Sequence, residues 1–246
     1  MSITNFYNNF HNRARIQSKL INDRNITYRV ILSELNSSLK IYNYNILDYG
    51  CGVGTLVLYY ASKNNSVIGV DVSDSAIRLA NESKAILGLE NKCTFYTLKE
   101  SKKYLSNKKY NLIICSEVIE HVNNDTKLIK YFNKLIKKNG FLFITTPSIR
   151  APLYRLGLLG KFDSKVGHLR RYDQKELEKM IISSKYKIIF SNKTEGVLRN
   201  LLYTNKYLGF LLKFLKGIIS DSFTVIDNLL IPIFGESNIH ILAKKL

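Results

Sequence analysis

Cysteine, long apolar runs and acidic residues are all scarce in this chain of 246 residues. The three cysteines (Cys51, Cys93 and Cys115) have the spacing of neither a disulfide framework nor a metal site, which predicts an intracellular, reducing setting. No apolar run approaches the roughly 20 residues needed to span a bilayer, and the N-terminus has no apolar segment of the kind found in signal peptides. We therefore expect a cytoplasmic protein.

Only 19 residues are acidic against 37 basic ones, so the formal net charge is +18. A surface of this sign attracts nucleic acid or an anionic membrane. The lysines are scattered rather than clustered, so a nucleic-acid partner is the less favoured interpretation, and a peripheral membrane contact stays open. Hydrophobic residues make up 46% of the chain, which is enough for the core of one large α/β domain.

Three glycines at alternate positions are the most informative feature of the chain. Residues 46–55 read ILDYGCGVGT, a short apolar strand followed by Gly50, Gly52 and Gly54 and then by the start of a helix. Glycine permits backbone angles closed to other residues and lets a ligand touch the main chain. The spacing G-x-G-x-G differs from the G-x-G-x-x-G of dinucleotide sites. The segment therefore predicts a binding turn for a nucleotide-like cofactor other than a dinucleotide.

Two acids accompany this glycine bend. Asp48 stands two residues before the first glycine, and Asp71 ends a second apolar strand over 66–71, where a carboxylate can bind both hydroxyls of a ribose. In this order the acids and glycines resemble the first motifs of the class I S-adenosylmethionine (SAM) methyltransferases. The resemblance implies an enzyme with SAM as its cofactor, whose amino-acid tail is cradled by main-chain amides of the bend.

The resemblance also implies a set of cofactor-binding residues. They are Asp48, Gly50, Cys51, Gly52, Gly54, Asp71, Val72, Thr97, Leu98, Ser116 and Glu117. The family usually reads the adenine amino group with an aspartate after the third strand, and residues 95–100 contain none. We expect backbone groups of Thr97 or Leu98 to serve instead.

A second motif, CSEVIEHV at 115–122, is similar to the E-V-L-E-H-V segment of the ubiquinone-biosynthesis type of O-methyltransferase. That similarity puts Ser116 and Glu117 beside the methionine half of SAM, where a carboxylate offsets the positive sulfonium. Glu120 and His121 have three interpretations. They form a hydrogen-bonded pair that anchors the loop, or His121 is a base, since imidazole titrates near neutral pH. Alternatively they join Glu117 in a metal site, which holds magnesium in some relatives that methylate catechols or RNA 3′ ends.

A third motif, FDSKVGHLRRYD at 162–173, resembles the G-H-x-R-x-Y/F element of bacterial methyltransferases of glycan, lipid or quinone biosynthesis. It follows a strand, where ligands of open α/β sheets bind. His168 is the first candidate for the catalytic base, ahead of His121, and a candidate fourth metal ligand. Arg170 and Tyr172 are candidate substrate contacts, as is Tyr7 near the N-terminus. In the alternative interpretation His168, Arg170 and Tyr172 only cap the next helix, with Asp173 as its N-cap. Arg171 is expected to have a structural role.

Strands and helices alternate from 45 to 146, which is typical of a parallel sheet wrapped by helices. The expected strands are 45–49, 66–71, 92–97, 110–115, 140–146, 185–193 and 238–243. The expected helices are 54–63, 73–88, 123–138 with Gly140 as C-cap, and 173–184. With the resemblance this gives an α/β, Rossmann-like class I methyltransferase fold, a seven-stranded and mostly parallel sheet with helices on both faces and an antiparallel last strand. We expect a mostly helical N-terminal cap over 1–44 and a methyltransferase domain over 45–246, with insertions at 147–172 and 197–235.

Within the second insertion, residues 207–219 read YLGFLLKFLKGII, apolar on most sides with lysines at 206, 213 and 216. A buried or dimer-forming helix, an in-plane membrane helix and a lid for a lipid-linked substrate all fit 206–219. The expected function is transfer of the SAM methyl group to a hydroxyl of a small molecule, such as a quinone precursor, lipid or glycan intermediate. An RNA methyltransferase and a SAM-binding protein without turnover are the alternatives.

Overall fold

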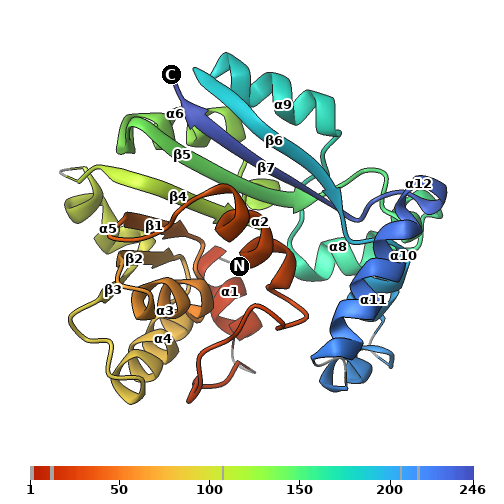
Figure 1. Ribbon diagram of the computed structural model, residues 1–246, viewed down its shortest axis with the longest axis horizontal. Coiled ribbons are helices and arrows are strands. Elements are labelled where there is room, and N and C mark those ends of the chain that lie inside the picture. Colours follow the sequence, from red (N-terminus) through yellow and green to blue (C-terminus); the bar gives the residue numbers. More distant parts are fainter. Residues whose placement is uncertain (1–2, 12–13, 107, 206, 215–216) are drawn as a thin grey trace.

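The computed structural model describes residues 3–11, 14–106, 108–205, 207–214 and 217–246. Within them lies a seven-stranded sheet of order β3-β2-β1-β4-β5-β7-β6 (Figure 1). Its strands are β1 (Asn45–Tyr49), β2 (Ser66–Asp71), β3 (Cys93–Thr97), β4 (Tyr110–Ser116), β5 (Ile136–Pro147), β6 (Tyr186–Thr194) and β7 (Asn238–Lys245). Neighbouring strands are parallel except at β7, which runs antiparallel to both β5 and β6. The expected mostly parallel sheet with an antiparallel last strand is confirmed.

Helices cover both faces of the sheet. In the described residues they are α1 (Ile3–His11), α2 (Arg29–Ser38), α3 (Thr55–Ser62), α4 (Asp74–Ile86), α5 (Leu98–Leu105), α6 (Asp125–Leu135), α7 (Pro152–Arg155), α8 (Gly160–Val166), α9 (Gln174–Ser183), α10 (Val197–Thr204), α11 (Ile218–Leu229) and α12 (Ile231–Phe234), with short 3-10 turns η1 (Ile119–His121) and η2 (Gly209–Lys213). One half of the core packs α2, α3 and α4 against the sheet, and the other half packs α5, α6 and α9.

Local sequence explains where several helices begin. The hydroxyl of Ser73 accepts a hydrogen bond from the amide of Ala76 at the start of α4, and the carboxylate of Asp173 caps α9 in the same way. Helix α5 has no counterpart among the expected helices. It begins with a capping box, in which the side chains of Thr97 and Glu100 each accept from the other's amide. The T-x-x-E spacing of that box was present in the sequence.

The helix expected over 123–138 is shorter than predicted. Helix α6 ends at Leu135, and β5 begins at Ile136, which pairs with Tyr110 of β4. Gly140 therefore lies inside β5, and its prediction as the C-cap of the helix is wrong. A Cβ added at Gly140 would lie 2.7 Å from the side chain of Ile136 and 3.0 Å from the carbonyl oxygen of Asn111. Strand pairing with β4 outweighs the helical spacing of the apolar residues here.

The N-terminal segment is less helical than predicted. Residues 14–28, between α1 and α2, are irregular. Ile16 and Leu20, which belong to the range expected to be mostly helical, are 43% and 42% exposed. The segment is anchored by Gln17, whose side-chain amide donates to the carbonyl oxygen of Val53 (3.0 Å) beside the glycine bend. The division of the chain into a cap and a domain stays a prediction.

The second insertion forms a group of helices beside the sheet, made of α10, α11 and α12 (Figure 1). A continuous helix over 206–219 is not formed: in the described part of this range, η2 is a short 3-10 turn and α11 begins only at Ile218. Residues 206, 215 and 216 lie outside the described residues. Gly217, with φ at 56°, precedes α11, the longest described helix of the insertion. In the described ranges of the chain, no helix combines the length and apolar character needed to cross a membrane.

Candidate active site

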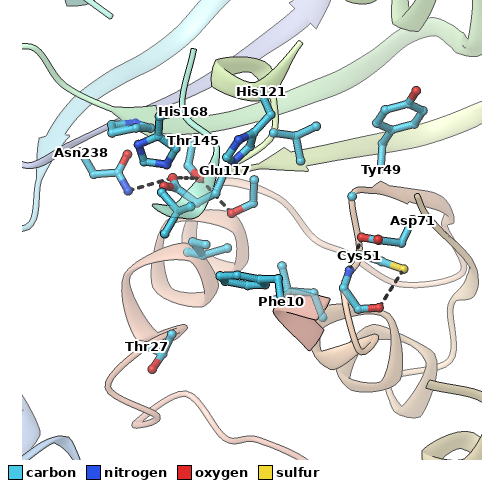
Figure 2. A pocket seen from close by; sticks show the side chains of 18 of the residues that line it. Phe10, Thr27, Tyr49, Cys51, Asp71, Glu117, His121, Thr145, His168 and Asn238 are labelled. Atoms are coloured by element: carbon cyan, nitrogen blue, oxygen red, sulfur yellow. Dashed lines mark hydrogen bonds between the residues drawn. The ribbon is translucent and has the colours of Figure 1, made fainter. Parts of the chain in front are cut away.

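A cavity of about 640 Å³ lies where the parallel strands end (Figure 2). Its walls include the last residues of β1, β2 and β4 and three side chains of α1, which lies across it: Tyr7, Phe10 and His11. The antiparallel strand β7 begins at this edge, so its first residues reach the cavity as well. Ligands of open α/β sheets bind at this edge.

The glycine bend needs its glycines for two reasons. Gly50, Gly52 and Gly54 all have positive φ, at 84°, 53° and 81°. There is also no room for a side chain at two of them. A Cβ at Gly50 would overlap the side chain of Val118, and one at Gly54 would lie 2.6 Å from the ring of Phe95. The alternate spacing therefore reflects both backbone geometry and close packing against β3 and the segment after β4.

The amides of the bend are already paired within the protein. The amides of Gly50 and Cys51 donate to the carbonyl oxygen of Val70, at 2.7 and 3.0 Å. The amide of Gly52 donates to Oδ2 of Asp71 at 2.9 Å. Each amide has one proton, so these three amides are not free to donate to the amino-acid tail of SAM, contrary to the prediction from the sequence. The bend instead lines the cavity with Gly50, Cys51 and Gly52.

Asp71 is held ready to accept further hydrogen bonds. Its Oδ1 accepts from the amide of Ser73 (2.9 Å) and its Oδ2 from that of Gly52. Each carboxylate oxygen has two lone pairs, so one remains on each oxygen for a diol. Nearby Asp48 is 3% exposed. Burial, with the charge of Asp71 as a second cause, raises the pKa of Asp48 to about 7.

The other predicted cofactor residues divide into two groups. Val72, Leu98, Ser116 and Glu117 line the cavity with Asp48 and Asp71. Gly54 and Thr97 are not among the lining residues. Gly54 is the buried N-cap of α3, and Thr97 uses both its amide and its hydroxyl in the capping box of α5.

Glu117 marks the opposite end of the cavity from Asp71 (Figure 2). Its backbone has φ at 55°, a strained conformation for this residue type. Its Oε1 accepts from the hydroxyl of Thr145 and from the side-chain amide of Asn238, both at 2.9 Å. No ion pair to a cation is present for this carboxylate in the described residues. Glu117 is therefore a negative group that faces the cavity without a charged partner.

His168 and Asp163 form a hydrogen-bonded pair at this end. Nδ1 of His168 lies 2.9 Å from Oδ1 of Asp163, and Arg171 donates to both oxygens of the same carboxylate. Burial favours protonation of Asp163, but the hydrogen bonds from Arg171 and His168 prevail and lower its pKa. An ionised carboxylate only accepts, so Nδ1 carries the proton and Nε2 keeps a lone pair. Burial lowers the pKa of His168, so the imidazole is neutral at pH 7.

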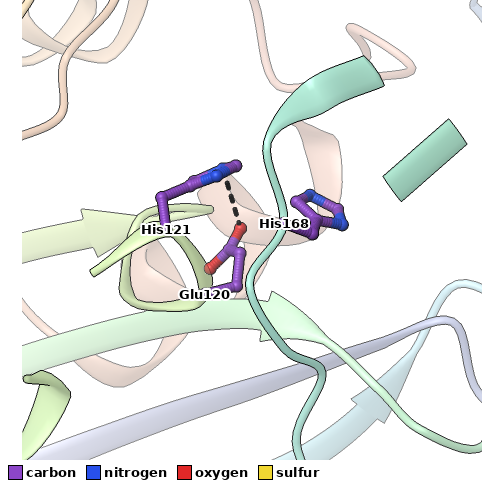
Figure 3. Close-up of side chains that lie close together, drawn as sticks. All are labelled: Glu120, His121 and His168. Atoms are coloured by element: carbon purple, nitrogen blue, oxygen red, sulfur yellow. Dashed lines mark ion pairs between the residues drawn. The ribbon is translucent and has the colours of Figure 1, made fainter. Parts of the chain in front are cut away.

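His121 lies beside His168, with ring centroids 5.0 Å apart. Its Nδ1 donates to the carbonyl oxygen of Gly167 (2.9 Å), and Nε2 is 3.6 Å from Oε1 of Glu120 (Figure 3). Glu120 is fully buried; burial, followed by the charge of Glu117, raises its pKa well above the usual range. Thr146 donates to its Oε2, whereas Oε1 has no hydrogen-bond partner in the described residues.

Three of the four predicted metal ligands come together. Atoms of Glu120, His121 and His168 that can bind a metal lie within 4.8 Å of one another (Figure 3). The unpartnered Oε1 of Glu120 and the two imidazoles, each oriented through Nδ1, fit the requirements of a cation site. Glu117, the fourth predicted ligand, is outside this cluster and bonds to Thr145 and Asn238.

The predicted substrate contacts are placed differently from one another. Tyr7 lines the cavity and packs edge-on against His121, with centroids 5.7 Å apart. Burial raises the pKa of Tyr7 to about 12. Arg170 and Tyr172 are not among the lining residues, because both donate to Oδ2 of Asp125 at 2.8 Å. Arg171, predicted to be structural, does line the cavity and is paired with Asp163.

Residues of the second insertion, of the last strand and of the short links on either side of the insertion complete the cavity and were not predicted as site residues. They are Glu195, Asn200, Tyr203, Thr204, Ser237, Asn238 and His240. Asn238 and His240 alternate with apolar residues in β7, and this alternation could have identified them as facing one side. His240 is oriented by Glu34 of α2, with Nδ1 2.6 Å from Oε2.

Comparison with known proteins agrees with this geometry. A family model described as a methyltransferase domain matches residues 9–188. The chain therefore belongs to the methyltransferase domain family and has the fold of the class I SAM-dependent enzymes. One relative is the ubiquinone biosynthesis O-methyltransferase of Pelagibacter ubique, 32% identical over 127 residues, which cover 51% of this chain and 51% of that protein. The chain thus spans about half the length of the curated relatives it matches.

Two solved structures illustrate the range of the fold. Magnesium protoporphyrin IX methyltransferase from Synechocystis PCC 6803, solved with bound SAH, has a TM-score of 0.61 at 16% identity and covers 89% of this chain and 82% of its own. The [4+2]-cyclase SpnF has a TM-score of 0.64 at 13% identity and covers 99% and 92%. At these identities the likeness shows the fold alone. None of these comparisons supports a metal cofactor.

Proposed function

We propose that the protein transfers the methyl group of SAM to a hydroxyl oxygen of a small molecule. One observation carries the proposal: a single cavity has the glycine bend with Asp71 at one end and His168, which is hydrogen-bonded to Asp163 behind it, at the other. The first end suits the adenosine of SAM. The second end supplies a neutral imidazole whose Nε2 can take a proton from a substrate hydroxyl.

Different residues of the site bind SAM and serve the transfer step. Asp71 binds the two ribose hydroxyls through its remaining lone pairs, and Asp48, Ser116 and Glu117 lie toward the methionine half. The carboxylate of Glu117 offsets the charge of the sulfonium. The substrate oxygen attacks the methyl carbon in line, the C–S bond breaks as the O–C bond forms, and the hydroxyl proton passes to Nε2 of His168. Asp163 then stabilises the imidazolium, and S-adenosylhomocysteine is released.

The acceptor end favours a substrate with several hydrogen-bonding groups. Asn200, Thr204 and Asn238 line it, together with the carboxylates of Glu117 and Glu195. The relative named above is a ubiquinone biosynthesis O-methyltransferase, which supports a hydroxylated ring of the kind found in quinone precursors. Lipid-linked and glycan intermediates also present hydroxyls and belong to the proposed acceptor class.

Isotope transfer tests this function. Purified protein is incubated with SAM carrying a deuterated methyl group and with a small-molecule extract, and products are identified by mass spectrometry. We expect a product heavier by one labelled methyl group, its amount greatly reduced in His168→Ala. Lys130→Ala, an exposed residue on the outer side of α6, serves as the control and retains the product. If the wild-type protein binds SAM and labels no molecule, the chain is a SAM-binding protein without turnover.

A metal-assisted version of the reaction is the second candidate, favoured by the cluster of Glu120, His121 and His168. A divalent cation held there would lower the pKa of a hydroxyl bound to it. Chelation with EDTA distinguishes the two versions. Unchanged turnover supports His168 as the base, whereas loss of turnover that magnesium restores supports the cation. Label recovered in an RNA fraction instead of small molecules would support the RNA alternative.

A further inference from the structure

Helix α11 is built the opposite way from an ordinary surface helix, because it buries its polar face. Ser220, Thr224 and Asp227 recur at helical spacing and are 0%, 8% and 0% exposed. The hydroxyl of Ser220 accepts from Arg29, and that of Thr224 accepts from Arg199 at 2.8 Å. Hydrogen bonds and ion pairs therefore dock α11 to the rest of the protein.

The apolar side chains of α11 point outward. Ile219, Val225, Ile226 and Leu229 are 61%, 59%, 52% and 69% exposed. The carboxylate of Asp227 meanwhile accepts from backbone amides at the start of α10. An apolar face of this kind is costly in water, and large exposed apolar patches mark interaction sites.

The exposed apolar side chains continue onto neighbouring elements. Ile233 of α12 is 70% exposed, and Leu156 and Leu158, which follow α7, are 70% and 64% exposed. Helix α7 packs on α10, α10 and α12 both pack on α11, and Gly235 after α12 lies against the carbonyl oxygen of Arg150, so these elements adjoin. We call the exposed side chains of α11, α12 and 156–158 the apolar surface: Leu156, Leu158, Ile219, Val225, Ile226, Leu229 and Ile233.

Cationic side chains accompany the apolar surface. Arg150 precedes α7, Arg155 is the last residue of α7, Lys161 and Lys165 belong to α8, and all four are exposed. Asp221, the acidic residue in the first turn of α11, is paired with Arg29, so its negative charge is offset within the protein. The apolar surface and its cationic border lie in a chain of net charge +18.

This charge pattern selects the occupant. A second copy docked symmetrically on the apolar surface would bring two cationic borders together, and like charges facing each other across an interface oppose association. An anionic lipid surface complements both the apolar side chains and the cations. With 12 residues, α11 is about 18 Å long, so it lies in the plane of a membrane rather than across it.

We propose that the apolar surface rests on an anionic lipid surface, with α11 in the plane of the interface. The consequence for the site is a short route to the cavity. Helix α10 packs against α11 and contributes Asn200, Tyr203 and Thr204 to the cavity wall, and α8 contributes Phe162 and Val166. A substrate with an apolar tail could then keep the tail in lipid while its polar head enters the cavity.

Vesicle flotation tests this proposal on the full chain. The vesicles are phosphatidylcholine alone and phosphatidylcholine mixed with phosphatidylglycerol. We expect the wild type to float with the anionic vesicles only, and Ile226→Glu to weaken this binding by about tenfold or more, because one exposed isoleucine leaves the lipid. Ile182→Glu is the matched control. Ile182 lies on α9 and is 56% exposed against 52% for Ile226, and the substitution introduces the same charge.

A second pair of variants tests the charges. Lys161→Glu, in the cationic border, should weaken binding and Lys130→Glu, on the outer side of α6, should leave it unchanged. High salt should release the protein. The thermal unfolding of every variant is measured as well, and a cooperative transition shows that the variant is folded. Three results would overturn the proposal: no binding of the wild type to anionic vesicles, equal losses in Ile226→Glu and Ile182→Glu, or a wild-type dimer in light scattering that Ile226→Glu separates.

Discussion

Replacing Asp71 by asparagine should abolish most of the affinity for SAM while preserving the fold. The substitution keeps the shape of the side chain and an acceptor oxygen, but it turns the other oxygen into a donor. Both ribose hydroxyls then lose a charged acceptor, and one of them faces a donor instead. Hydrogen bonds to charged groups contribute about 1.5–3 kcal/mol each, so weakening these two corresponds to a loss of about 100-fold or more in Kd.

Isothermal titration calorimetry measures this loss directly. Asp74→Asn is the control, because Asp74 lies three residues along the chain, is exposed in the first turn of α4 and has the same charge. It should bind SAM as the wild type does. Wild-type affinity in Asp71→Asn would refute the assignment of Asp71 to the ribose, and an equal loss in Asp74→Asn would reduce the effect to general electrostatics.

Three further predictions concern stability and pH. Gly54→Ala should lower the free energy of unfolding by about 1–3 kcal/mol because its Cβ meets Phe95, and by more than Gly52→Ala, which has space; urea unfolding compares them. The rate of methyl transfer should rise with pH, with its inflection below the ordinary imidazole pKa of 6.5, because the neutral form of His168 is the active one. Asp163 raises the pKa of His168, so Asp163→Asn should lower the rate and move the inflection to lower pH. An unmoved inflection would contradict the pairing of these two residues. Asp48 has a pKa of about 7 when folded against 3.8 normally, so its contribution to stability is present below 3.8 and is lost as pH rises through 7. Asp48→Asn should therefore stabilise the SAM-free protein at pH 8, by at most about 4 kcal/mol in the free energy of unfolding, and by less at pH 5. Scanning calorimetry measures this as a rise in melting temperature that is larger at pH 8 than at pH 5.

The parts of the site that are local in sequence were the predictable ones. The glycine bend and Asp71 each follow an apolar strand, and parallel strands bring their ends to one edge whatever the loops do. The sheet followed from the same alternation of strands and helices. Helix limits failed where tertiary contacts decided them, as at Ile136, which pairs with β4 instead of extending α6.

Side-chain direction in extended segments could not be read from the sequence. Successive residues of an extended chain point to opposite sides. In 170–172 this places Arg170 and Tyr172 on Asp125 and turns Arg171 to the cavity, the reverse of the prediction. The acceptor end was also missed. His240 lies on the antiparallel last strand, and Glu195 follows the strand beside it, so both reach the cavity only through the pairing of distant segments.

A crystal structure with S-adenosylhomocysteine would show which side chain binds the ribose and where the sulfur atom lies. We expect both ribose hydroxyls within hydrogen-bond distance of the Asp71 carboxylate, with the sulfur atom on the side of the cavity that holds Glu117 and His168. A ligand whose ribose lies away from Asp71, or whose sulfur faces away from His168, would contradict it.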